Sequence, residues 1–179
     1  MKRITLMAVV AIMALTAVSC KKIPVLKLDE EAIVPEVPIP TSEYYITYKV
    51  DGVAVTATEV SAIRGITDSP RTLTILGNAK SGVVPKFKFF SEESFIGFVA
   101  GLNMWSDKNS YPTHYIEYTS SAGMLFSTEN IDEGTYFFIS EASYKNGGNI
   151  KGSFNGTVMT NKGVTAKITD GLFNVKFSN

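Results

Sequence analysis

The chain has 179 residues, with 17 basic and 17 acidic side chains, one histidine and one cysteine. This length allows one domain with a core large enough to be stable without disulfides. The balanced charge gives no reason to expect nucleic acid as a partner, and a single histidine and cysteine are too few for the usual zinc sites.

The first 19 residues have the pattern of an export signal. Lys2 and Arg3 give a positive start, and an apolar run from Ile4 to Val18 follows. The run fits the core of a signal peptide, about 7–15 residues, and is shorter than the ~20 residues of a membrane-spanning helix. We therefore predict a signal peptide over residues 1–19.

The run ends in Ala17-Val18-Ser19-Cys20, which resembles the lipobox of bacterial lipoproteins. This resemblance implies cleavage before Cys20, attachment of fatty acyl chains such as palmitate to it, and anchoring to a membrane. Ala17 stands where the family usually has leucine. The alternative is an ordinary secretory signal that leaves a free thiol, which an oxidising compartment would disfavour.

Residues 20–42 are predicted to be a tether between the lipid and the folded domain. Four of the seven prolines lie here, and proline favours extended, polyproline-II-like backbone. Lys21 and Lys22 precede the acidic run from Asp29 to Glu31, whereas surface-exported lipoproteins begin their acidic patch directly after the cysteine. This order favours the periplasmic face of an outer membrane over the cell surface.

Residues 43–179 have the period-two hydrophobic pattern of β-strands, interrupted by glycine, asparagine and aspartate at predicted turns. The pattern predicts one all-β antiparallel domain of about ten strands, a two-sheet sandwich in preference to an up-and-down, lipocalin-like barrel. The clearest predicted strands are residues 45–50, 53–60, 72–76, 113–119, 135–142, 150–160, 165–169 and 172–177. Asp170-Gly171 is predicted to be the turn between the last two.

The last third carries the motifs Gly134-Thr-Tyr136, Gly152-Ser-Phe-Asn-Gly156 and Thr169-Asp-Gly-Leu-Phe173. With Lys49-Val-Asp-Gly52, these resemble small Bacteroidota-type outer-membrane lipoproteins. The resemblance implies the same anchoring and an all-β fold, and it implies no particular activity. From the residues themselves, we expect Phe154 and Phe173 in the core.

The sequence contains few residues suited to catalysis. His114 is the only histidine, and no Gly-x-Ser-x-Gly, calcium-loop or phosphate-loop motif occurs. Glu59, Glu117 and Glu141 lie in or beside predicted strands, and a hydrolase would need two of them, or one with His114, facing each other in a cleft. We therefore expect no catalytic residues, no metal and no cofactor other than the covalent lipid on Cys20.

The best candidate for recognition is the segment from Leu102 to His114, which we expect to be a loop between strands. Aromatic rings among polar turn residues suit stacking on a carbohydrate or on a protein partner. The alternative is that the tryptophan folds back and caps the core. The candidate recognition residues are Trp105, Asp107, Asn109, Tyr111 and His114.

Together these features predict a lipid-anchored, non-catalytic accessory or binding protein of the cell envelope, with a protein or glycan partner. One alternative is a carrier with a small carbohydrate or apolar ligand inside a barrel. A second is an envelope hydrolase that uses the strand carboxylates.

Overall fold

A computed structural model of the chain describes residues 42–65, 71–78, 85–92, 98–145 and 147–178. The predicted signal peptide, Cys20 and the tether up to residue 41 lie outside these ranges. In the described part of the chain, no helix has the length and apolar character needed to cross a membrane.

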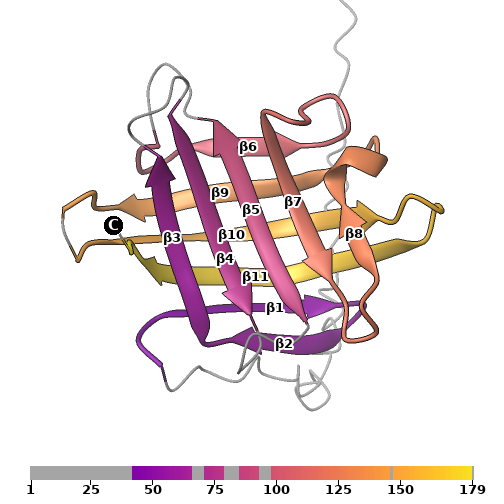
Figure 1. The fold of residues 1–179 in the computed structure, drawn as a ribbon, viewed down its shortest axis with the longest axis horizontal. Coiled ribbons are helices and arrows are strands. Elements are labelled where there is room, and N and C mark those ends of the chain that lie inside the picture. The colour runs from indigo at the N-terminus through magenta and orange to yellow at the C-terminus, as the bar shows by residue number, and fades with distance from the viewer. Residues whose placement is uncertain (1–41, 66–70, 79–84, 93–97, 146, 179) are drawn as a thin grey trace, which may run out of the picture. The chain divides into compact units, whose positions relative to one another are not determined.

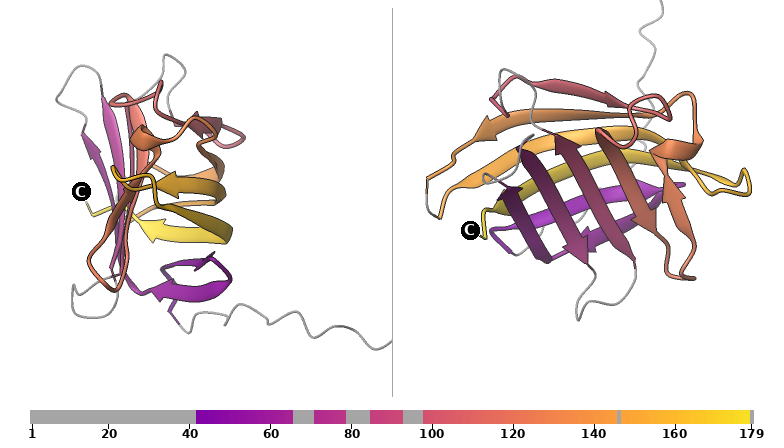
Figure 2. Two further views of the ribbon diagram at one scale, coloured as in Figure 1. Left: turned by 90° about the vertical axis from the view of Figure 1, so that its right-hand side faces the viewer. Right: turned by 45° about the horizontal axis from the view of Figure 1, so that its top comes forward.

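The described residues form eleven antiparallel strands in two layers that face each other, and the strands of one layer run across those of the other (Figures 1 and 2). The front layer in Figure 1 contains β3 (Glu59–Gly65), β4 (Thr72–Asn78), β5 (Lys86–Glu92), β7 (His114–Thr119) and β8 (Leu125–Ser127). The back layer contains β6 (Asn103–Ser106), β9 (Thr135–Ala142), β10 (Asn149–Met159), β11 (Thr165–Lys176), β1 (Tyr45–Val50) and β2 (Val53–Ala57). A short 3-10 helix, η2 (Thr128–Asn130), follows β8.

The two layers belong to one hydrogen-bonded sheet. Ser127 of β8 pairs with Met159 of β10, which joins the front layer to the back layer. On the other side, a single bridge between Ala62 and Phe177 brings β3 close to the end of β11. The prediction of one all-β antiparallel domain is confirmed: the layers face each other as in a sandwich, and the sheet follows a nearly closed, barrel-like path.

Aromatic rings fill the space between the layers. Phe137 of β9 stacks on Phe89 of β5, with ring centroids 3.8 Å apart, and on Phe173 of β11 at 4.7 Å. The ring centroids of Phe154 of β10 and Phe87 of β5 are 4.5 Å apart. Because successive side chains of a strand point to opposite faces, only every second residue of each strand faces this core. The expected core positions Phe154 and Phe173 are both buried.

Two predicted strand boundaries are wrong. Asp170-Gly171 is not a turn, because β11 continues through it and forms a bulge in its pairing with both β1 and β10. Asp170 has a positive φ of 54°, a conformation that an aspartate tolerates in a bulge as well as in a turn. The predicted strand over residues 53–60 is divided at Thr58, where the chain leaves the back layer as β2 and enters the front layer as β3.

Candidate functional site

A groove of about 370 Å³ lies between β6 and the neighbouring ends of β5 and β7. Its polar lining comes from both layers, and its apolar lining from β6 and the segment before it. The lining residues are Ser91, Glu92, Phe98, Leu102, Asn103, Met104, Trp105, Thr113 and His114. This volume is at the small end of the ~300–1,000 Å³ usual for ligand pockets.

Trp105 is the largest side chain of the groove and is 51% exposed. It lies in β6, whose described pairing is with β9 alone, so the other edge of β6 faces the groove. The segment from Leu102 to His114 is therefore not all loop, because its first third is this edge strand. Half of the indole surface remains available for contact.

The tryptophan is held in position at its polar edge and at its backbone. Its indole interacts with the side chain of Asp107, and this interaction helps to lower the pKa of that carboxylate. Nε2 of His114 lies 2.7 Å from the carbonyl oxygen of Trp105. A carbonyl oxygen can only accept, so Nε2 carries the proton in this hydrogen bond. Neither of these two contacts involves a face of the indole ring.

The apolar floor of the groove belongs to the core. Phe98 is buried, and Leu102 and Met104 pack against the core cluster. The Ser91 hydroxyl lies 3.7 Å from the Met104 sulfur. The groove therefore combines a fixed apolar floor with an exposed ring and polar groups at its rim, an arrangement typical of ligand sites.

Asp107 and Asn109 form the turn after β6 and do not line the groove. Oδ1 of Asp107 accepts from the amides of Asn109 and Ser110, at 2.8 and 3.1 Å. Partial burial alone would raise the pKa of Asp107, but these hydrogen bonds, with those from the Trp105 and Asn109 side chains, lower it below its ordinary value. The structure thus places Asp107 beside Trp105 and outside the lining of the groove.

Tyr111 lies on a different surface from Trp105. Its ring packs on Tyr115, with centroids 5.3 Å apart, on the outer face of the front layer. The pKa of Tyr111 is raised above its ordinary value, mainly by the negative charge of Glu129. The structure therefore brings Trp105 and His114 together and separates Tyr111 from them.

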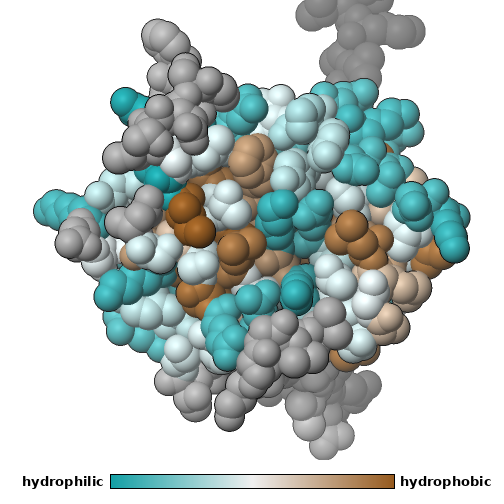
Figure 3. Space-filling view, in the orientation of Figure 1, coloured by the Kyte–Doolittle hydropathy of each residue, from teal (hydrophilic) through white to brown (hydrophobic). Residues whose placement is uncertain are grey.

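The outer face of the front layer is mixed in character. In Figure 3, apolar surface over β3 and β4 is separated by a hydrophilic group from a second apolar area on the side of β8. Lys88 belongs to this face, where its ammonium lies 3.2 Å from Glu117 and donates to the Tyr115 hydroxyl at 2.8 Å. Lys88 and Glu117 of this face are thus paired with each other.

The carboxylates that a hydrolase would need do not meet. Glu117 is paired with Lys88 on the front layer, and Glu141 is paired with Lys151 on the back layer at 2.9 Å. Glu59 begins β3 and lines neither of the two hollows described here. His114, which lines the groove, shares it with none of these three. Among the described residues, no group of three or more side chains could hold a metal ion.

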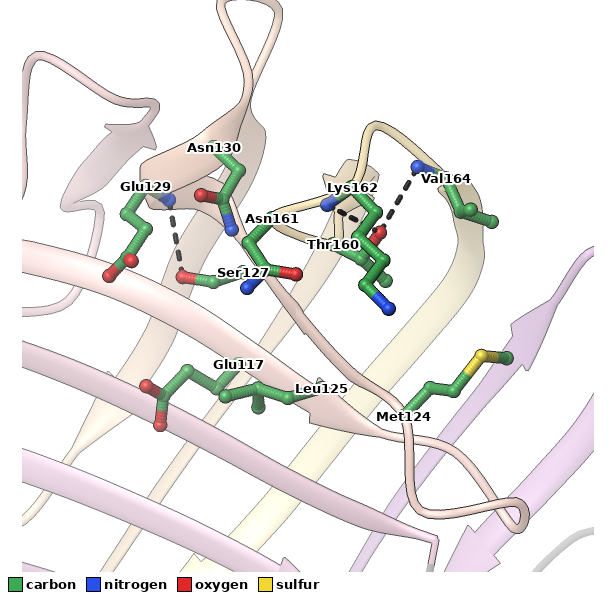
Figure 4. A pocket seen from close by; sticks show the side chains of 10 residues that line it. All are labelled: Glu117, Met124, Leu125, Ser127, Glu129, Asn130, Thr160, Asn161, Lys162 and Val164. Atoms are coloured by element: carbon green, nitrogen blue, oxygen red, sulfur yellow. Dashed lines mark hydrogen bonds between the residues drawn. The ribbon is translucent and has the colours of Figure 1, made fainter.

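A second hollow, of about 340 Å³, lies between β8 and the turn that joins β10 to β11 (Figure 4). Met124, Leu125 and Val164 give it an apolar wall, and the Lys162 side chain extends from the turn toward it. Glu117 and Glu129 both line it. Amides of Lys162 and Val164 donate to Oγ1 of Thr160 and so hold the turn in place, at 3.3 and 3.1 Å.

The groove residues Ser91, Glu92 and Phe98 lie outside the segment predicted for recognition, and Asn103 lies inside it but was not among the predicted recognition residues. Asn103 was placed in a loop, although the alternation of exposed and buried residues over β6 is that of a strand. Glu92 lies far from Trp105 in sequence and reaches the groove only because Ser91 pairs with His114. No local signal in the sequence could have connected the two segments.

Comparison of the chain with protein-family models, with curated proteins and with solved structures finds no match in any of the three.

Proposed function

We propose that this protein is a lipid-anchored, non-catalytic binding protein of the cell envelope that holds its ligand in the Trp105 groove. The observation that carries the proposal is a half-exposed indole on a strand whose backbone is bound by His114, standing over a buried apolar floor. An aromatic ring that is fixed before binding loses little conformational freedom when a ligand stacks on it.

Because side chains fill the interior, binding in the surface groove is favoured over the alternative of a carrier with its ligand inside a barrel. The ring stack of Phe89, Phe137 and Phe173 occupies the space between the layers where an interior ligand would lie. The hydrolase alternative has less support, since its three carboxylates share neither of the two described hollows and two of them are paired with lysines.

The anchoring part of the proposal rests on the lipobox-like sequence before Cys20. We expect Cys20→Ala to move the protein from the membrane fraction to the soluble fraction of the envelope. Immunoblotting of the two fractions measures this. Continued membrane association of the variant would contradict the anchor.

The binding part can be tested by fluorescence, because Trp105 is the only tryptophan in the chain and can be replaced biosynthetically by 5-hydroxytryptophan, which is excited at longer wavelengths than the tryptophans of other proteins. Solubilised envelope components from a strain that lacks the protein should shift the emission of this residue and protect it from quenching by acrylamide, in a saturable way. Tyr111→Ala removes an aromatic ring of similar exposure, 46%, from a different surface and should leave the protection unchanged. If no envelope fraction protects Trp105, the groove is not the binding site.

A further inference from the structure

We infer that the ligand of the Trp105 groove is a neutral oligosaccharide, and that it continues from the groove across the outer face of β6, β9 and β10. This inference rests on the proposed function, because the oligosaccharide would begin at Trp105. The outer face in question is the side of the back layer that is turned away from the front layer (Figure 2, left).

The strand register places two rings and an amide in one row on this face. Trp105 lies opposite Tyr136, and Tyr136 lies opposite Asn155. Neighbouring strands are ~4.7–4.9 Å apart, so the two rings lie side by side. Trp105 and Asn155 are exposed and Tyr136 is half-buried, so the row forms a shallow platform that leads away from the groove.

The next row supplies further hydrogen-bonding groups. Asn103 lies opposite Phe138, and Phe138 lies opposite Ser153. The Tyr136 hydroxyl donates to Oδ1 of Asn103, which fixes the amide and leaves its Nδ2 without a partner among the described residues. The Asn155 amide likewise has no hydrogen bond to the described part of the chain. A carboxamide both donates and accepts, which suits the hydroxyl groups of a sugar.

The distribution of charge indicates a neutral ligand. These two rows contain no charged side chain, and the pair nearest along β9 and β10 is Glu141 with Lys151, which are bound to each other at 2.9 Å. The groove itself contains Glu92, and Asp107 lies beside the indole, so an anionic ligand would be repelled. Flat rings, unpaired amides and this charge pattern together suit the apolar faces and hydroxyl groups of a neutral sugar chain.

The test is an array of neutral and anionic oligosaccharides, followed by calorimetric titration of the neutral ones that bind, in lengths from two to six sugar units. We expect binding of neutral sugars only, with affinity that increases with length. Tyr136→Ala should weaken the longest chain roughly tenfold, and Asn155→Ala roughly three- to tenfold, with little effect on the disaccharide. Tyr111→Ala and Asn161→Ala, an aromatic ring and an amide away from this face, are the matched controls.

The possible failures are distinguishable. If only anionic sugars bind, or if the two variants leave the length dependence unchanged, the inferred ligand path is wrong. If no neutral sugar binds while an envelope fraction still protects Trp105 from quenching, the groove keeps its role and the ligand is of another class, such as a protein. If neutral sugars bind equally well to Trp105→Ala, both the ligand path and the proposed site are wrong.

Discussion

Strand β9 carries aromatic rings on both of its faces, and the two faces differ in what the rings do. Phe137 points between the layers, where it is fully buried against Phe89 and Phe173. Tyr136 and Phe138, its neighbours in the chain, point outward beside Trp105 and Asn103. The alternation of a strand decides which ring stabilises the fold and which rings form the proposed platform.

The chemistry of the rings follows this division. The buried rings of the stack are phenylalanines, which need no hydrogen-bond partner. Outside, the Tyr136 hydroxyl binds Asn103, and the Trp105 indole interacts with the Asp107 side chain. A polar atom at the edge of a ring allows the ring to be held in place while its face stays open to solvent. Burial fixes the inner rings, whereas polar contacts at the ring edge hold Tyr136 and Trp105 on the outer face.

The largest effect that this comparison predicts is the loss of an inner ring. Phe137→Ala would leave a cavity between Phe89 and Phe173 and should cost about 3–5 kcal/mol of unfolding free energy. Urea unfolding followed by far-UV circular dichroism measures this. Phe138→Ala removes the same ring from the other face of β9 and should cost only about 1 kcal/mol. Equal losses in the two variants would show that the faces do not differ as described.

A smaller loss of stability is expected when a side chain is added at Gly152, which lies close to the backbone of β9 and to the ring stack. A Cβ on Gly152 would lie 1.9 Å from the Phe138 carbonyl oxygen and 2.5 Å from the Phe173 ring. Gly152→Ala should therefore destabilise the fold by about 1–3 kcal/mol, as overpacked cores do. Ser153→Ala, one residue further on the outer face, should change stability by less than about 0.5 kcal/mol. An unchanged unfolding midpoint for Gly152→Ala would mean that the stack adjusts without cost.

Local pattern was enough to predict the class of fold and most of the strands. The alternation over Thr135–Ala142 and Asn149–Met159 predicts strands close to those observed, because most of their inner positions are apolar, with Thr135 as an exception. The bulge at Asp170 could not be predicted, since Asp-Gly is equally typical of a turn. What decides between them is the pairing of β11 with strands on both sides, which is not a local property.

The candidate site was predicted only in part for the same reason. Trp105 and His114 stand out as the only tryptophan and the only histidine, and both line the groove. Tyr111 was grouped with them by closeness in sequence, although the chain turns between them and directs it to another surface. Tyr136 and Asn155 could be added to Trp105 only from the strand register.

The outer rings should contribute far less to stability than the inner ones. Trp105→Ala should cost no more than about 1 kcal/mol, because half of its surface is already exposed. Thermal unfolding followed by circular dichroism measures this, and calorimetric titration with an oligosaccharide that binds should show that affinity is lost. A loss of stability as large as that of Phe137→Ala would make Trp105 a part of the core.

The smallest effect is expected from the interaction between the Asp107 side chain and the Trp105 indole. The pKa of Asp107 lies below its ordinary value of 3.8 in the folded protein, so its hydrogen bonds stabilise the turn above this pH and are lost as the pH falls through the lowered pKa. Trp105 emission should therefore change in an acid transition whose midpoint lies below 3.8. Asp107→Asn should abolish this acid transition. A transition that persists in the variant would show that protonation of Asp107 is not its cause.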